Sequence, residues 1–248
     1  MLPQDSKSTS DNHDPNQHSY SIDNVSDRKR PQCDHRINII KPPEIPYRAG
    51  FLLGDGAGMG KGRTLAGFVL ENVSRGRAKH VWISVSSDLF EDACRDLRDI
   101  DLKDFAANNC HLLGSQPYGK LSMNEGLIFA TYSTLIAQSS KLSTKKGPVT
   151  RLQQLVEWLG GSEFDGLLMF DECHKAKNIV VNAEGEVNMK AGCTQTAAAV
   201  LMLQNKLPRA RVVYCSATSV SEVQNLPFMT RLGLWGPGTF TLFHFHFD

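Results

Sequence analysis

The sequence has no marked excess of charge, no paired cysteine motif and no long hydrophobic run. Its 27 basic and 26 acidic side chains leave a net charge of +1, which excludes the global basic field of a dedicated nucleic-acid-binding domain. Its six cysteines include no C-x-x-C pair, so we expect reduced, mostly buried thiols. No apolar segment approaches the ~20 residues of a membrane helix, and polar residues follow Met1 where a signal peptide would be apolar. We therefore expect a soluble protein without membrane contact.

Side chains that bind metals are also sparse. Residues 33–35 (Cys-Asp-His) and 244–246 (His-Phe-His) carry such side chains, but neither stretch has partners at the spacing of zinc ligands. We predict no structural metal site.

Residues 1–46 are rich in Ser, Asp, Asn, Gln and Pro and show no sustained hydrophobic periodicity before residue 37. Such a segment buries too little apolar surface to offset the entropy lost on ordering, so we predict a disordered polar tail. Its last part, residues 41–46, is a proline-rich linker. Residues 28–31 (Arg-Lys-Arg-Pro) resemble part of a nuclear-localisation signal, although a solvated charge cluster is the alternative interpretation.

From residue 47 onward, short apolar segments alternate with helical patterns. Apolar strands that alternate with helices are typical of a parallel sheet covered on both faces. We predict strands at residues 51–53, 80–85, 126–131, 166–170 and 211–215, and helices at 64–74, 88–97, 151–159 and 194–203. Ser86 or Ser87 is expected to cap the second helix, and residues 141–150 to form an exposed loop. The predicted fold class is α/β, with one domain over residues 47–248.

A glycine-rich segment, residues 54–64 (GDGAGMGKGRT), joins the first predicted strand to the first predicted helix. This is the context of a P-loop, in which glycines let backbone N–H groups surround phosphates and a helix N-terminus adds positive potential. Lys61 is expected to reach the β- and γ-phosphates. The predicted nucleotide contacts are Gly56, Gly58, Gly60, Lys61, Gly62, Arg63 and Thr64. The alternative interpretation is a glycine-rich turn that binds no ligand.

Two positions depart from the P-loop pattern G-x-x-x-x-G-K-[ST]. Asp55 stands where the first glycine is expected, and Gly62 stands where a hydroxyl would bind Mg²⁺. We predict Thr64, two residues later, as the substitute metal ligand.

Asp171 and Glu172 directly follow the predicted strand 166–170. In P-loop proteins an aspartate at such a strand end holds Mg²⁺, and the next carboxylate orients or deprotonates the attacking water. We therefore predict Asp171, Glu172 and Lys61 as catalytic residues, with Asp171 binding the Mg²⁺ of the nucleotide. The alternative is a carboxylate cluster that only stabilises a helix N-terminus. Because parallel strands end at one edge of a sheet, Lys61 should lie close to both carboxylates.

Small hydroxyl residues, Ser216 and Thr218, follow the last predicted strand. We predict that they bond the acidic motif and transmit the state of the nucleotide. His174 is expected to act with them as a coupling residue. Cys173 is expected to pack in the core, since no base is placed to activate it.

Together these motifs resemble motifs I, II and III of superfamily 2 helicases, and residues 82–86 and 131–135 resemble motifs Ia and Ib. Within that superfamily the sequence most resembles the Strawberry notch family. The supporting strings are residues 54–63 (GDGAGMGKGR), 171–178 (DECHKAKN) and 231–236 (RLGLWG). The family shares the Gly-Lys-Gly-Arg string, so Gly62 agrees with the resemblance, which extends from about Arg48 to about Phe240.

The resemblance implies a RecA-like domain that binds ATP and Mg²⁺. It also implies a nuclear protein that regulates transcription, with chromatin, histones and transcription factors as partners; a cytoplasmic location is the alternative. Two other functions stay open: half of an ATP-dependent DNA or RNA helicase or translocase completed in trans, and a protein-interaction module with a vestigial nucleotide site. Nucleic acid is expected to bind weakly, through phosphate contacts from Ser86 and Thr131.

Two features that the family resemblance leads us to expect are not found in these 248 residues. One is the second RecA-like domain, and the other is the family's region just upstream of the P-loop, which would hold adenine and is replaced by the proline-rich linker. We therefore expect a fragment, an isoform or an incomplete gene model. ATP should bind weakly and be hydrolysed slowly or not at all, because the arginine finger belongs to the second domain and contributes about 10³–10⁵ in rate.

Overall fold

The computed structural model describes residues 39–40, 47–144, 147–179, 187–188, 192–218 and 227–234. Most of the predicted disordered tail, residues 1–46, therefore lies outside the described residues. Two residues within it form a short strand, β1 (Ile39–Ile40), which pairs antiparallel with β9 (Val187–Asn188).

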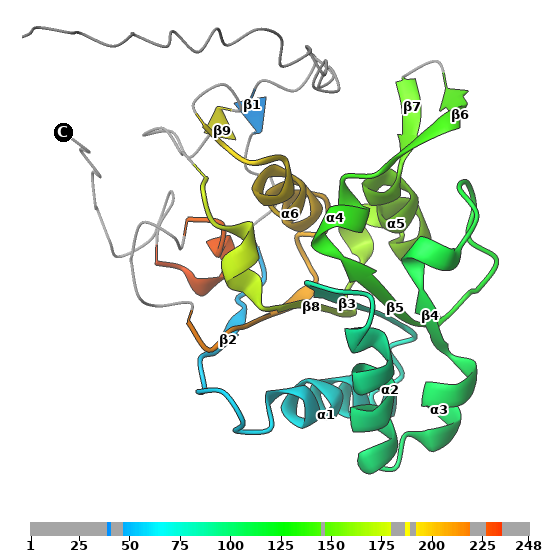
Figure 1. Cartoon of the computed structure of the whole chain (residues 1–248), viewed down its shortest axis with the longest axis vertical. Coiled ribbons are helices and arrows are strands. Elements are labelled where there is room, and N and C mark those ends of the chain that lie inside the picture. Colours follow the sequence, from blue (N-terminus) through cyan, green and yellow to red (C-terminus); the bar gives the residue numbers. More distant parts are fainter. Residues whose placement is uncertain are drawn as a thin grey trace, which may run out of the picture. The chain divides into compact units, whose positions relative to one another are not determined.

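A six-stranded sheet, in which every pairing is parallel, forms the centre of the fold (Figure 1). In spatial order its strands are β2 (Phe51–Leu53), β10 (Arg211–Cys215), β8 (Leu167–Asp171), β3 (Lys79–Ser84), β5 (Gly126–Thr131) and β4 (Cys110–Leu112). The inner strands are buried on both faces, which explains their continuous apolar sequences. The parallel α/β sheet predicted from the sequence is confirmed.

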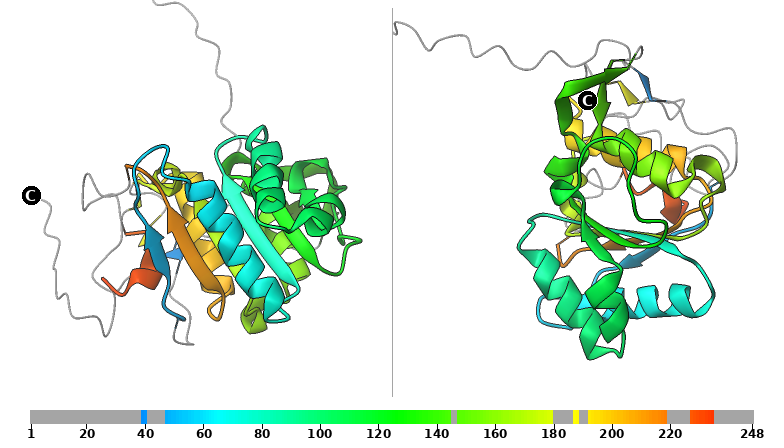
Figure 2. Two further views of the ribbon diagram at one scale, coloured as in Figure 1. Left: turned by 90° about the horizontal axis from the view of Figure 1, so that it is seen from below. Right: turned by 90° about the vertical axis from the view of Figure 1, so that its right-hand side faces the viewer.

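Helices cover both faces of the sheet, as Figures 1 and 2 show. One face carries α1 (Lys61–Ser74), α2 (Leu89–Asp99) and α3 (Lys103–Asn108); the other carries α4 (Tyr132–Leu135), α5 (Arg151–Leu159) and α6 (Gln195–Lys206). Successive strand residues alternate between the two cores: Val81 and Ile83 pack toward α5 and α6, whereas Trp82 packs toward α1 and α2. No helix among the described residues is long and apolar enough to cross a membrane.

Local details differ from the predictions. The first helix begins at Lys61, three residues early, because Gly60 in the left-handed conformation forms its N-cap. The second helix follows Asp88, so the predicted cap by Ser86 or Ser87 is wrong; the Ser86 hydroxyl instead accepts a bond from the Asp88 amide. The predicted loop 141–150 contains most of an antiparallel hairpin, β6 (Gln138–Thr144) and β7 (Gly147–Thr150). Short 3-10 turns occur at Leu113–Ser115, Gly161–Glu163, Cys173–Ala176 and Thr230–Leu232.

Arg231 holds the chain segment that leads into β2. Its guanidinium is buried and donates to the backbone carbonyls of Arg48, Gln204, Leu207 and Pro208. It also stacks on Tyr47, with 4.3 Å between the guanidinium carbon and the ring centroid. Because the last turn of a helix has unpaired carbonyls, this side chain caps α6 and ties that end to the entrance of β2.

Candidate nucleotide-binding site

The glycine-rich loop lies between β2 and α1, as the sequence predicts. Gly58 and Gly60 have φ angles of +77° and +79°, a conformation that side chains with a Cβ rarely adopt. A Cβ added at Gly56, Gly58 or Gly60 would meet no atom within 4 Å. All three glycines are exposed, so packing leaves space beside them. A loop of this kind before a helix can direct its backbone N–H groups at an anion.

Lys61 is the first residue of α1, at the positive end of the helix. Its Nζ donates to the Gly56 carbonyl at 2.8 Å, so the side chain folds back over the loop. The first turn of α1 contains no acidic residue that would oppose a phosphate. A phosphate bound in the loop would meet both the ammonium group and the helix N-terminus.

The structure gives Arg63 and Thr64 partners within the protein. The Arg63 guanidinium pairs with the Asp99 carboxylate of α2 at 2.8 Å. The Thr64 hydroxyl donates to the Gly60 carbonyl at 3.3 Å, a bond within the first turn of its own helix. Their predicted contacts with nucleotide and metal stay predictions, and each would require these bonds to be exchanged.

Asp96 of α2 approaches Gly62 closely. A Cβ at this position would lie 2.0 Å from Oδ2 of Asp96, so a side chain here would force the end of the Asp96 side chain to move. Asp96 has 14% of its side chain exposed, and burial raises the pKa of its carboxyl while Arg95 and Arg63 oppose that rise. Sequence reasoning missed Asp96 because no motif marks it.

Asp171 ends β8 with both carboxylate oxygens bonded. Oδ2 accepts from the Ser84 hydroxyl at 2.9 Å, and Oδ1 accepts from the Glu172 amide at 3.0 Å. The Tyr132 hydroxyl donates to the Asp171 carbonyl at 2.8 Å. Ser84 is buried at the end of the neighbouring strand β3. These bonds fix the orientation of the carboxylate before any metal binds.

Glu172 has φ 46° and ψ 46°, the left-handed conformation, which is uncommon for a residue with a side chain. Such strain costs about 1–3 kcal/mol and persists where the surrounding structure enforces it, commonly at functional sites. This turn directs the chain sharply away from the sheet directly after Asp171.

The register of the sheet places the two motifs at one edge. Cys215 is aligned with Leu53, the last residue before the glycine-rich loop, and on its other side with Asp171. Neighbouring strands lie about 4.8 Å apart, so the backbones of Leu53 and Asp171 are separated by about 10 Å. Burial and the Asp171 carboxylate raise the pKa of the Cys215 thiol while Lys61 opposes that rise, which places both groups near this sulfur.

The three predicted coupling residues meet beside the acidic motif. Nδ1 of His174 lies 2.9 Å from the Ser216 hydroxyl, 3.5 Å from the Thr218 hydroxyl and 3.3 Å from Oε2 of Glu172. Cys173 is buried, and burial raises the pKa of its thiol to about 12, consistent with the predicted packing role. The structure thus brings together the residues predicted to link the acidic motif to the last strand.

Thr131 does not present its hydroxyl to the surface. It is buried and caps α4, accepting a bond from the Thr134 amide at 3.1 Å. Its predicted contact with a nucleic-acid phosphate stays a prediction and would require this bond to be exchanged. Ser86 is also engaged within the protein, with its hydroxyl 3.3 Å from the Asp88 carboxylate.

The donor set suits Mg²⁺ held jointly with a nucleotide. No group of three or more His, Cys, Asp or Glu side chains that could hold a metal occurs among the described residues. Nucleotide-bound Mg²⁺ needs only one or two carboxylates, because phosphates and waters complete its octahedral coordination. Asp171 offers one such carboxylate at the end of β8.

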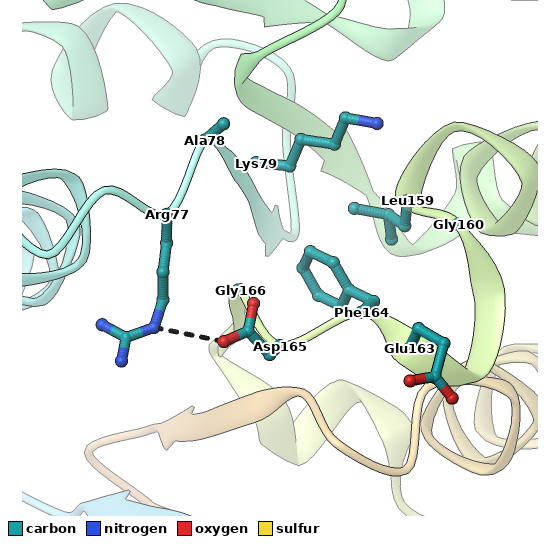
Figure 3. A pocket seen from close by; sticks show the side chains of 9 residues that line it. All are labelled: Arg77, Ala78, Lys79, Leu159, Gly160, Glu163, Phe164, Asp165 and Gly166. Carbon is teal, nitrogen blue, oxygen red and sulfur yellow. Dashed lines mark ion pairs between the residues drawn. The ribbon is translucent and has the colours of Figure 1, made fainter.

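A separate cavity of about 250 Å³ lies where β3 and β8 begin, at the opposite edge of the sheet (Figure 3). Arg77 and Lys79 line it together with Asp165. Arg77 lies 3.6 Å from the Asp165 carboxylate, and Lys79 donates to the Trp158 carbonyl at 2.6 Å. Both basic groups have partners within the protein, and the cavity is remote from the glycine-rich loop.

Comparison with known proteins agrees with this geometry. The family model "P-loop containing NTP hydrolase pore-1" matches residues 10–246. We expected the similarity to begin at about Arg48, and this match begins further upstream. Protein strawberry notch homolog 1 of Gallus gallus is 52% identical over 198 residues, covering 77% of this chain and 15% of that protein. Protein FORGETTER 1 of Arabidopsis thaliana is 51% identical over 197 residues, covering 77% of this chain and 14% of that protein.

A solved structure is also similar, the Sulfolobus solfataricus SWI2/SNF2 ATPase core in complex with dsDNA, at 18% identity and a TM-score of 0.49. The matched region covers 76% of this chain and 32% of the chain in that solved structure. The chain spans about a seventh of the length of the curated relatives named above. The resemblance to the Strawberry notch proteins is confirmed by a sequence identity of 52% over 198 residues. The chain belongs to the P-loop containing NTP hydrolase pore-1 family.

Proposed function

We propose that this chain binds ATP with Mg²⁺ at the edge of the sheet formed by the ends of β2, β10 and β8. The observation that carries the proposal is the left-handed backbone at Gly58 and Gly60, which places Lys61 at the start of α1. The aligned register then sets Asp171 two strands from the loop. Ligands of parallel α/β sheets bind at this edge.

Each residue of the motif has a role in this proposal. Lys61 exchanges its bond to the Gly56 carbonyl for the β- and γ-phosphates. Asp171, oriented by Ser84, would hold Mg²⁺, and the cation would neutralise phosphate charge. Glu172 orients the attacking water, and its contact with His174 would carry the presence of the γ-phosphate to Ser216.

Turnover by this chain alone should be slow. An arginine that stabilises the transferred phosphoryl group contributes about 10³–10⁵ in rate. The arginine within the glycine-rich segment, Arg63, is paired with Asp99. Binding and hydrolysis are therefore expected to separate, with binding measurable and hydrolysis near background.

A fluorescent ATP analogue, titrated with and without Mg²⁺, tests the proposal. Lys61→Ala should abolish binding, whereas Lys103→Ala, which removes an exposed lysine from α3, should leave it unchanged. Glu172→Gln should bind ATP nearly as the unaltered chain does. Undetectable binding at millimolar ATP would favour a protein-interaction module with a vestigial site. Robust hydrolysis stimulated by DNA or RNA would favour a translocase.

We propose further that the nucleotide site serves a nuclear regulator of transcription, with chromatin, histones and transcription factors as partners. Similarity to the Strawberry notch proteins supports this proposal. The test is imaging of a tagged chain together with chromatin fractionation of the unaltered protein and Lys61→Ala. Exclusively cytoplasmic protein, or recovery free of chromatin in both variants, would contradict it.

A further inference from the structure

We infer that Cys215 is a positioning residue for the metal-binding carboxylate: its thiol donates to Asp171 from β10, while Ser84 donates from β3 on the other side. The inference rests on the proposed nucleotide site, in which Asp171 would hold Mg²⁺. Its basis is the row that Ser84, Asp171 and Cys215 form, each as the last residue of its strand, at the ends of three neighbouring strands.

The register of the sheet sets these three residues side by side. Cys215 is aligned with Asp171 across the β10–β8 pairing. Phe170 is aligned with Ile83 across the β8–β3 pairing, so Ser84 stands next to Asp171 on the opposite side. Neighbouring strands lie about 4.8 Å apart, which is within reach of short side chains. The carboxylate therefore has one donor-bearing side chain on each side.

The row faces the layer of α1 and α2. Side chains alternate along a strand, so each member of the row shares a face with the residue two positions before it. Those residues are Trp82, Met169 and Val213, and all three belong to the core between the sheet and these helices. Cys215 is itself part of that core. The thiol and the carboxylate thus lie on the side of the sheet where Lys61 begins α1.

The Cys215 thiol is fully buried and has Asp171 as its hydrogen-bond partner. A thiol is protonated at neutral pH and an ionised carboxylate only accepts, so the thiol is the donor. An S–H group is a weak donor, but a charged acceptor strengthens the bond. Burial and Asp171 raise the pKa of this thiol while Lys61 opposes the rise, so the pair lies near the lysine of the loop.

Three donors fix the carboxylate from different directions. The Ser84 hydroxyl donates to Oδ2 at 2.9 Å and the Glu172 amide donates to Oδ1 at 3.0 Å. Cys215 adds a donor from the β10 side, where no other strand residue bonds this carboxylate among the described residues. A carboxylate offers about four lone-pair sites, so three donors leave one for a cation. Such supporting bonds commonly contribute about tenfold to a hundredfold in metal affinity.

The first experiment detects the bond itself and needs no nucleotide. Raman difference spectra between the unaltered 248-residue chain and Cys215→Val isolate the S–H stretching band of Cys215. Donation to a carboxylate weakens the S–H bond, so this band should lie at lower frequency than that of a free thiol. In an Asp171→Ala background the same band should move to higher frequency. A free-thiol band in the unaltered chain, or a band that Asp171→Ala leaves unmoved, overturns the inference.

The second experiment measures the consequence for the cation. Mn²⁺, used in place of Mg²⁺ and followed by electron paramagnetic resonance, is titrated into the chain saturated with a non-hydrolysable ATP analogue. Cys215→Val fills the space without a donor and should weaken Mn²⁺ binding by about tenfold or more. Cys215→Ser retains a donor and should keep most of the affinity. In Cys215→Val the loss should be larger for Mn²⁺ than for the metal-free nucleotide.

The matched control is Cys110→Ala, which removes a half-buried thiol from β4 at the far side of the sheet and should leave Mn²⁺ affinity unchanged. Thermal unfolding shows whether each variant is folded, and Cys215→Ala replaces Cys215→Val in both experiments if the valine is not accommodated.

The outcomes are separable. Mn²⁺ affinity in Cys215→Val equal to that of the unaltered chain overturns the positioning role. Equal losses from Cys215→Val and Cys215→Ser also overturn it, because they would reflect packing at the end of β10. If the unaltered chain binds no nucleotide, the proposed function fails, and the Raman band still decides whether the thiol holds Asp171.

Discussion

His80 should make the stability of this protein depend on pH in a calculable way. It is the second residue of β3, fully buried, with its ring 6.2 Å from that of Phe105. Burial lowers its pKa from 6.5 to about 4, because the surrounding protein disfavours a charged imidazole. In the unfolded chain the same side chain titrates near 6.5. Folding therefore requires a neutral ring over a pH range in which the unfolded chain is protonated.

The direction and size of the effect follow from linkage. Above about pH 6.5 neither state holds the proton and the full stability is present; as pH falls from there toward 4, only the unfolded state gains it. A pH of 5 lies about 1.5 units below the pKa of the imidazole in the unfolded chain, and each pH unit corresponds to about 1.4 kcal/mol of free energy. His80 alone should thus lower the free energy of unfolding by about 2 kcal/mol between pH 7 and pH 5.

The assay is urea denaturation of the unaltered chain, His80→Leu and His80→Phe at pH 7 and pH 5. When the pH is lowered from 7 to 5, the free energy of unfolding of both variants should fall by about 2 kcal/mol less than that of the unaltered chain. The two substitutions pack differently, so their stabilities at pH 7 should differ while their pH dependence agrees. An unchanged pH dependence in both variants would refute the argument that this histidine is held neutral by burial.

Other perturbations test the fold and the surface of the site. Arg231→Met should lower the free energy of unfolding by about 3 kcal/mol or more, since it leaves several buried carbonyls without a donor; a loss below about 1 kcal/mol by chemical denaturation would contradict the account of its bonds. Gly62→Ala would place a Cβ 2.0 Å from Oδ2 of Asp96, at the movable end of that side chain, so it should lower the free energy of unfolding by no more than about 1 kcal/mol, and by less beside Asp96→Ala; a loss of about 3 kcal/mol would show that the carboxylate cannot move aside. Single-stranded DNA or RNA should bind only at micromolar or higher concentration in anisotropy titrations, and more weakly as salt rises, because the net charge is +1; tight, salt-resistant binding would show a phosphate-binding surface that we have not identified.

The sequence alone determined those features whose signals are local. Strands such as β3 and β10 are apolar throughout because both faces are buried, and this pattern is visible without a structure. The glycine-rich loop can be identified from the sequence, because few residues other than glycine adopt the left-handed backbone found at positions 58 and 60. Asp171 directly follows the predicted strand 166–170 and is the last residue of β8 in the structure. Because parallel strands end at one edge, its nearness to the loop could be deduced from the predicted fold.

Elements without a local signal were missed. Strand β4 has three residues and pairs with a single neighbour, too short to show periodicity. The β6–β7 hairpin is held by antiparallel pairing between polar segments, so no apolar alternation marks it. The start of α1 was placed late because glycine is a poor helix former in isolation, whereas here the loop before Lys61 imposes the first turn.

Contacts between segments far apart in the chain were decided by tertiary structure alone. Asp96 lies 34 positions after Gly62 and carries no motif, yet the crossing of α2 over α1 brings its carboxylate to the loop. Arg231 caps α6 and holds the chain before β2, although it belongs to a string that only resemblance had marked. Thr131, which we expect to contact nucleic acid, also caps α4, a bond that no sequence pattern indicated. Side-chain type tells which bonds a residue can make, but the packing of helices on the sheet decides which partner is within reach.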